Sequence, residues 1–243
     1  MKVFSKGDIL HLERYLWVKK KPWSCEQKLW EKVGKYSPYF SKIPWVLCIC
    51  IGNSLAMNAA HKESDIDLFI ITKKKRIWTT RILITLLLNV LWERKTAKKH
   101  AWKFCLSFFI TEEALDFSSI AIKNDIYLYY WLTTLKPIIN RKHTFEKFMG
   151  INLSETPPIQ LSPNGRKSEL QDVVSFPPGE KEFKIEDWFF GNIFESCLKF
   201  FFLPRSKKSF QKLWKPFWVI ISDNMLKFHD KDKRKEIREI IFS

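Results

Sequence analysis

The stretch Trp45-Val-Leu-Cys-Ile-Cys-Ile-Gly-Asn-Ser54 begins with seven consecutive apolar residues and ends in a polar turn. A continuous apolar run of this length is typical of a β-strand that is buried on both faces. Two further apolar runs follow, one within Asp65-Ile-Asp-Leu-Phe-Ile-Ile-Thr72 and one beginning at Phe104. The predicted elements are strands over 45–51, 65–72 and 104–110, with a short helix over 55–60 after the first turn.

A long apolar stretch over 77–92 separates the second and third predicted strands. It holds 16 residues, among them Arg81 and Asn89. Because a helix needs about 20 apolar residues to cross a bilayer, we expect a buried helix here and no transmembrane segment.

Composition divides the chain into four segments. A helical lead-in over 1–44 ends at Ile43-Pro44, because the residue before a proline avoids the α-helical region. A strand-and-helix domain over 45–150 follows. A linker or loop over 151–182, with five of the 11 prolines, leads to an aromatic and helical C-terminal region over 183–243.

The composition of the 243 residues excludes several classes of protein. Hydrophobic residues make up 46% of the chain, which excludes wholesale disorder. Only 7 glycines are present, which argues against a dinucleotide-binding fold with its glycine fingerprint. The net charge of +16 favours an acidic partner such as nucleic acid, nucleotide phosphate or an anionic membrane surface. Lysine that simply fills solvated surface explains the charge equally well.

The cysteines and the N-terminus indicate a cytoplasmic protein. The five cysteines include no CxxC pair, and Cys48 and Cys50 share one strand face, where they cannot easily form a disulfide. Buried, reduced thiols are therefore expected. The first 16 residues carry charges throughout and contain no apolar signal core.

Two carboxylates mark the start of the second predicted strand. Asp65 and Asp67 are two positions apart, so their side chains project from one face. Such a pair suits magnesium, which prefers oxygen ligands and shares its coordination shell with substrate phosphates. In the turn before it, Gly52 lets the backbone approach a phosphate and Ser54 can cap a helix or donate to a phosphate oxygen. An EF-hand or a P-loop is excluded because the required residues are missing.

Gly52-Asn-Ser54, ten further residues and then Asp65-Ile-Asp-Leu68 resemble the signature of the DNA polymerase β-like nucleotidyltransferase superfamily, and especially that of its bacterial members. The resemblance implies an α+β fold with a small mixed β-sheet, helices packed against it and an appended helical C-terminal region. It implies that Asp65 and Asp67 are catalytic ligands of Mg²⁺. It further implies that Gly52, Asn53 and Ser54 bind a nucleoside triphosphate (NTP).

The chain departs from the family's pattern at two positions. Asn53 replaces a small residue of the turn, and asparagine tolerates the left-handed conformation that turns require. The third catalytic carboxylate, normally on a later strand, is missing from 104–110, where Ser107 is the only polar candidate facing inward. Glu112, just beyond that strand, is the candidate substitute, and two Mg²⁺ ions are expected only if a third carboxylate is supplied.

The expected activity is transfer of a nucleoside monophosphate from an NTP to a hydroxyl group of RNA, protein or a small molecule. A catalytically degenerate fold that binds nucleotide or RNA is the alternative, and a basic protein at a membrane surface is a third, weaker one. Ten basic residues and one acid lie between Lys73 and Lys103. This cluster favours a triphosphate or polynucleotide approach surface, or it consists of solvated helix ends. Within it, Arg81 is the candidate for triphosphate contact.

Overall fold

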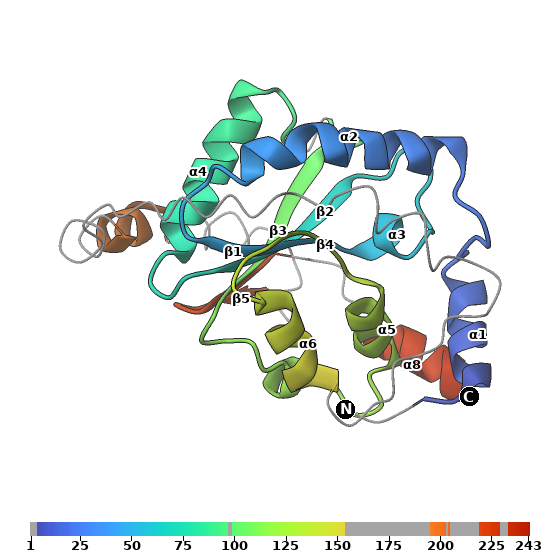
Figure 1. Ribbon diagram of the computed structural model, residues 1–243. Helices are drawn as coiled ribbons and strands as arrows, with labels where there is room; N and C mark the ends of the chain where they lie inside the picture. Colours follow the sequence, from blue (N-terminus) through green and yellow to red (C-terminus); the bar gives the residue numbers. More distant parts are fainter. Residues whose placement is uncertain (1–3, 97–98, 154–194, 203, 205–218, 229–232) are drawn as a thin grey trace.

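A mixed β-sheet with helices on both faces forms the centre of the molecule (Figure 1). The computed structural model describes residues 4–96, 99–153, 195–202, 204, 219–228 and 233–243. Within these residues the sheet has six strands in the order β4-β1-β2-β3-β6-β5, which confirms the expected α+β class. The strands are β1 (Val46–Ile51), β2 (Ile66–Thr72), β3 (Phe104–Thr111), β4 (Lys136–Asn140), β5 (Ile220–Ile221) and β6 (Met225–Lys227).

The three central strands are the three that the apolar runs predict. Every residue of β1, β2 and β3 is buried, as expected for strands covered on both faces. β1 pairs with β2 antiparallel, whereas β2 and β3 are parallel. Parallel neighbours need a crossover connection, and here the predicted buried helix supplies it as α4 (Ile77–Val90).

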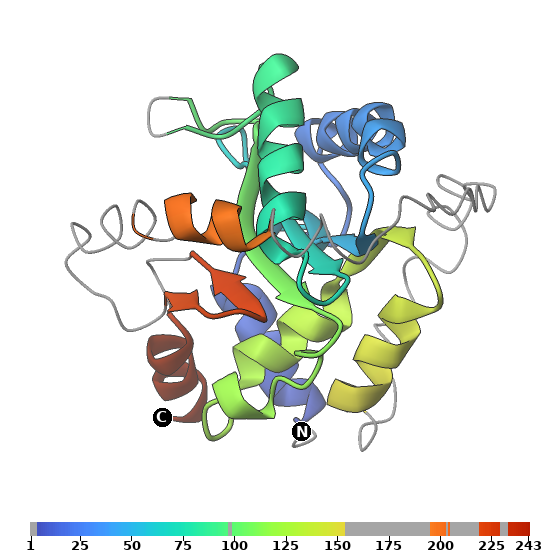
Figure 2. The same ribbon diagram turned by 90° about the vertical axis from the view of Figure 1, so that its left-hand side faces the viewer.

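Two sets of helices bury the two faces of the sheet (Figures 1 and 2). On one face, α2 (Ser24–Phe40) and α4 pack in a core that includes Leu29 and Ile84. The other face carries an aromatic core that includes Phe69 and Trp131. The helices that contribute to this second core are α1 (Lys6–Tyr15), α5 (Ile126–Thr134), α6 (Thr144–Leu153) and α8 (Arg234–Phe242).

Part of the C-terminal region joins the sheet instead of forming helix. Residues 195–202 and α8 are helical as expected. In contrast, β5 and β6 form an antiparallel pair, and β6 extends the sheet by pairing with β3. The expectation of a uniformly helical region over 183–243 is therefore wrong at these strands. The proline-rich segment, from residue 154 to residue 182, lies outside the described residues.

A buried ion pair fastens the last helix to the domain. Arg234 Nη1 lies 2.8 Å from Asp125 Oδ2, and the two side chains are only 5% and 2% exposed. Asp125 also caps α5, because its Oδ1 accepts from the N–H of Leu128 at 3.0 Å. Among the described helices, none combines the length and apolar character needed to cross a bilayer.

Candidate functional site

The turn after β1 lies directly beside the start of β2. The N–H of Gly52 donates to the carbonyl oxygen of Asp67 at 3.1 Å, so Gly52-Asn53-Ser54 and the Asp65/Asp67 pair occupy the same edge of the sheet. Asn53 has a φ of +51°, the left-handed conformation that asparagine adopts more readily than most residues. The structure therefore brings together the two halves of the sequence motif.

Gly52 lies close to helix α5. A Cβ atom at this position would lie 3.1 Å from the indole Nε1 of Trp131 on α5. This contact is closer than ordinary van der Waals contact, so a side chain at residue 52 would require Trp131 to shift by a few tenths of an ångström. The following short helix, α3 (Asn53–Ala56), begins from this constrained turn.

The thiol of Cys105, on the neighbouring strand, lies beside the carboxylate pair. Asp67 on β2 is the register partner of Cys105 on β3, and β-strand neighbours on one face have side chains in contact range. One carboxylate oxygen each of Asp65 and Asp67 and the Sγ of Cys105 all lie within 4.8 Å of one another. Asp67 is 8% exposed and Cys105 is 9% exposed. In the described part of the chain this is the one group of at least three acidic, cysteine or histidine residues with such spacing.

The environment of Cys105 favours the protonated thiol. Burial is the largest cause, and together with the charge of Asp67 it raises the pKa of Cys105 well above its usual value. The charge of Lys95 and a hydrogen bond with Ser107 act in the opposite direction but are weaker. Sequence reasoning assigned Cys105 to the buried, reduced thiols and missed its place beside Asp67, because that place depends on the register between two strands.

Lys95 forms an ion pair with one of the two carboxylates. Lys95 Nζ is 2.6 Å from Asp65 Oδ2, with the lysine side chain 40% exposed. Lys95 reaches this position because its N–H donates to the carbonyl of Phe104 at 2.9 Å, which aligns the segment around it with the edge of β3. Burial alone would lower the pKa of Lys95, but the hydrogen bond to Asp65 and the nearby acidic groups outweigh it, so the pKa is raised.

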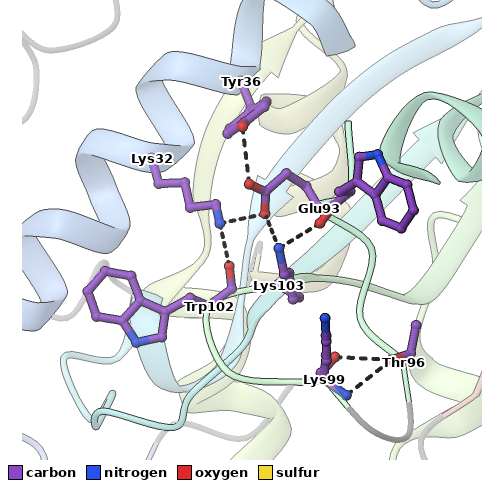
Figure 3. Close-up of polar contacts among 8 residues, drawn as sticks. Lys32, Tyr36, Glu93, Thr96, Lys99, Trp102 and Lys103 are labelled. Atoms are coloured by element: carbon purple, nitrogen blue, oxygen red, sulfur yellow. Dashed lines mark hydrogen bonds and ion pairs between the residues drawn. The ribbon is translucent and has the colours of Figure 1, made fainter. Parts of the chain in front are cut away.

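A partly buried polar network fixes the segment that carries Lys95 (Figure 3). The carboxylate of Glu93 accepts from Lys32 Nζ at 2.5 Å, from Lys103 Nζ at 3.0 Å and from the hydroxyl of Tyr36 at 3.1 Å. Burial acts to raise the pKa of Glu93, but the hydrogen bonds and charges of the two lysines lower it below its ordinary value. Since Lys32 and Tyr36 belong to α2, the network ties residue 93 to that helix.

A cavity of about 350 Å³ opens beside Asp65 and Ser54, whereas Asp67, Gly52 and Asn53 are not among its lining residues. Ser54 from the turn and Asp65 from the carboxylate pair both line the cavity, so each half of the motif contributes a lining residue. His61, from the loop between the halves, also lines it. The other lining residues are Leu16, Met57, Ala59, Glu63, Ser64, His100 and Tyr127.

Glu112 lies at the wrong end of the sheet to serve as the third carboxylate. Its N–H donates to the carbonyl of Thr72, the last residue of β2, and its Oε1 accepts from the N–H of Lys74. Because β2 and β3 are parallel, the two strands end together, roughly 20 Å along the sheet from the carboxylate pair at about 3.3 Å per residue. Glu112, directly after β3, therefore lies far from a ligand position at the start of that strand.

Arg81 does not line the cavity either. Its Nη1 donates to the carbonyl of Leu106 at 2.9 Å, and its guanidinium lies over the rings of Phe109 and Phe228. Both rings belong to the core on the α2/α4 face of the sheet, whereas Asp67 lies on the other face with Phe69. Burial, with a smaller effect from Arg94, lowers the pKa of Arg81 to about 10. Its position is that of a packing residue between α4 and β3, on the opposite face of the sheet from Asp67.

The basic cluster between Lys73 and Lys103 is partly neutralised within the protein. Lys74, Lys95 and Lys103 form ion pairs with carboxylates of this chain. These contacts reduce the charge that the cluster offers to a polynucleotide.

Comparisons of this chain with protein-family models, with curated proteins and with solved structures find no match.

Proposed function

We propose that this protein is a Mg²⁺-dependent nucleotidyltransferase that transfers a nucleoside monophosphate from an NTP to an acceptor hydroxyl. The observation that carries the proposal is the hydrogen bond from the Gly52 N–H to the Asp67 carbonyl oxygen. This bond holds the Gly52-Asn53-Ser54 turn, the proposed phosphate-binding element, beside the two carboxylates. In this account Asp65 and Asp67 hold the ion, while Gly52, Asn53 and Ser54 receive the phosphates. When bound, Mg²⁺ neutralises phosphate charge and polarises the phosphorus.

The proposed reaction gives separate roles to the carboxylate pair, the turn and the cavity. The acceptor oxygen forms a bond to the α-phosphorus, the bond from that phosphorus to the leaving pyrophosphate breaks, and the acceptor's proton is lost to a base. Ser54 at the cavity wall donates to a phosphate oxygen, and Asp65 lies on the same wall. The cavity between them offers space for the nucleoside or for the acceptor.

A second candidate function is nucleotide binding without transfer. Two observations favour it: a thiol, Cys105, stands beside the pair in place of a third carboxylate, and Lys95 already neutralises Asp65. With two carboxylates, an ion can arrive with the nucleotide, but activation of the acceptor loses a ligand. RNA is a partner in both candidates, as acceptor or as ligand, since the chain carries a net charge of +16.

One experiment separates the two candidates. The full chain is incubated with each α-labelled NTP, Mg²⁺ and mixed RNA, protein and small-molecule acceptors, beside the Asp65→Asn/Asp67→Asn double variant. Label transferred by the wild type and lost in the variant supports the enzyme. NTP binding lost in the variant, with no label transferred by either protein, supports the binding module. Equal labelling in the two proteins contradicts transfer at this site.

A further inference from the structure

The ligand set beside the Gly52 turn contains sulfur as well as oxygen. Asp65 and Asp67 come from β2, and Cys105 comes from the adjacent strand at the register position of Asp67. All three donor atoms lie within 4.8 Å of one another. An ion with bonds of about 2.3 Å to sulfur and about 2.0 Å to oxygen separates its ligands by roughly 3–4 Å. Small rotations of these side chains are therefore enough to enclose one ion.

Sulfur in this position changes the ion that the set prefers. Mg²⁺ takes hard oxygen ligands in octahedral geometry and keeps several waters. Thiolate is a soft ligand that selects zinc and related ions, and zinc accepts a mixed set of sulfur and carboxylate oxygen. The position of Cys105 therefore favours a thiophilic divalent ion over Mg²⁺.

The surroundings of the set accommodate a divalent charge. Lys95 Nζ lies 2.6 Å from Asp65 Oδ2, so the group already holds one cation. The side chain of Lys95 is 40% exposed, so it can rotate toward solvent and still remain near the three ligands. When the ion binds, the thiol of Cys105 releases its proton to solvent. Two carboxylates and the resulting thiolate then carry three negative charges, of which a divalent ion neutralises two. Asp67 and Cys105 are only 8% and 9% exposed, whereas Asp65 borders the cavity, which leaves the fourth position of such an ion open to water.

We propose that Asp65, Asp67 and Cys105 form a three-ligand site for a thiophilic divalent ion of the zinc class, which displaces Lys95 from Asp65. This ion binds in the absence of nucleotide, whereas the Mg²⁺ of the proposed reaction would arrive with the phosphates of the NTP. The inference concerns metal selectivity and goes beyond the nucleotidyl transfer proposed above. It holds even if no transfer occurs.

The test is the titration of the metal-free full chain with Co²⁺ and then with Zn²⁺. The wild type is expected to bind one Co²⁺ with a near-ultraviolet thiolate-to-cobalt charge-transfer band, which Zn²⁺ abolishes and excess Mg²⁺ does not. Cys105→Ser is expected to lose the band and to weaken Zn²⁺ binding at least about tenfold, since even outer-shell partners are worth about 10–100-fold. Lys95→Met is expected to bind Zn²⁺ more tightly, because no ammonium competes.

Two further variants make the outcome decisive. Cys197→Ser removes an exposed thiol and is expected to keep the band, which shows that the signal does not arise from that surface cysteine. Cys105→Asp is expected to bind Mn²⁺ or Mg²⁺ in preference to Zn²⁺. Each variant is first checked for an unchanged circular dichroism spectrum. If correctly folded Cys105→Ser keeps the band, or if Zn²⁺ binds no more tightly to the wild type than to Asp65→Asn/Asp67→Asn, the proposal is overturned.

Discussion

Asp67 on β2 and Cys105 on β3 are register partners on parallel strands, and their side chains meet on the same face of the sheet. This one pairing decides the composition of the candidate site. Among the residues that the structure describes, it places a thiol, and no third carboxylate, next to two aspartates. Together with the turn at Gly52, it defines the edge of the sheet at which the chemistry of this protein is proposed to occur.

Gly52→Ala is expected to destabilise the protein and to weaken nucleotide binding. The new Cβ would meet Trp131 Nε1 at 3.1 Å, and overpacking of this kind costs about 1–3 kcal/mol. Urea unfolding measures the loss. Gly34→Ala is the matched control, because a Cβ at that helical position has no neighbour within 4 Å and alanine favours the helix by about 0.5–1 kcal/mol. Equal effects of the two substitutions would argue against a close approach at Gly52.

Glu93→Gln is expected to reduce stability at neutral pH and to flatten its dependence on acid. The folded protein holds the pKa of Glu93 below its ordinary value of 4.5, so its charge contributes stability above that value. That contribution is lost as the pH falls through the lowered pKa. Replacing the charged acceptor of this partly buried network costs about 1–3 kcal/mol.

Urea unfolding of Glu93→Gln and the wild type at pH 7 and below pH 4.5 measures this dependence. The expected result is a large difference at pH 7 that shrinks in acid. Glu113→Gln provides the control, since its pair with Lys74 is exposed and such pairs contribute about 0–1 kcal/mol. A difference that stays constant with pH would contradict the role given to Glu93.

Arg234→Met is expected to cost about 3–5 kcal/mol of stability, because it leaves the buried carboxylate of Asp125 without its cation. The double variant Arg234→Met/Asp125→Asn is expected to lose less, since no charge remains buried while the asparagine can still cap α5. Thermal unfolding of the wild type, the two single variants and the double variant measures both effects. Additive losses would show that the two residues do not act as a pair.

The sequence predicts the central part of the fold well because that part is encoded locally. Strands β1 to β3 and helix α4 are continuous apolar runs, and each lies within a few residues of its predicted position. β4 is less visible because it contains Pro137, which is tolerated at the edge of a sheet. β5 and β6 are too short to show a period, and they exist because β6 completes the hydrogen bonds of β3.

The candidate site is predicted only in part, for a similar reason. Asp65, Asp67 and Gly52 are close in sequence, so their meeting follows from one strand, one turn and one strand. Cys105 lies on β3 and Glu112 directly follows it. This strand is reached through a crossover helix, so the distances of both residues from Asp67 depend on strand direction and register. The parallel pairing of β2 and β3 brings Cys105 to the pair and takes Glu112 to the far end.

The most direct test of the central claim is calorimetric titration of the full chain with NTP in the presence of Mg²⁺ or Mn²⁺. The claim is that the Asp65/Asp67 edge binds a metal-bound nucleotide, and it underlies both candidate functions. We predict saturable binding that Asp67→Asn weakens at least about tenfold, or 1.4 kcal/mol, whereas Asp116→Asn, which alters an exposed carboxylate hydrogen-bonded to Ser118, leaves it unchanged. Binding that is equally tight in the wild type and Asp67→Asn, or no binding of any NTP to the wild type, would contradict the account.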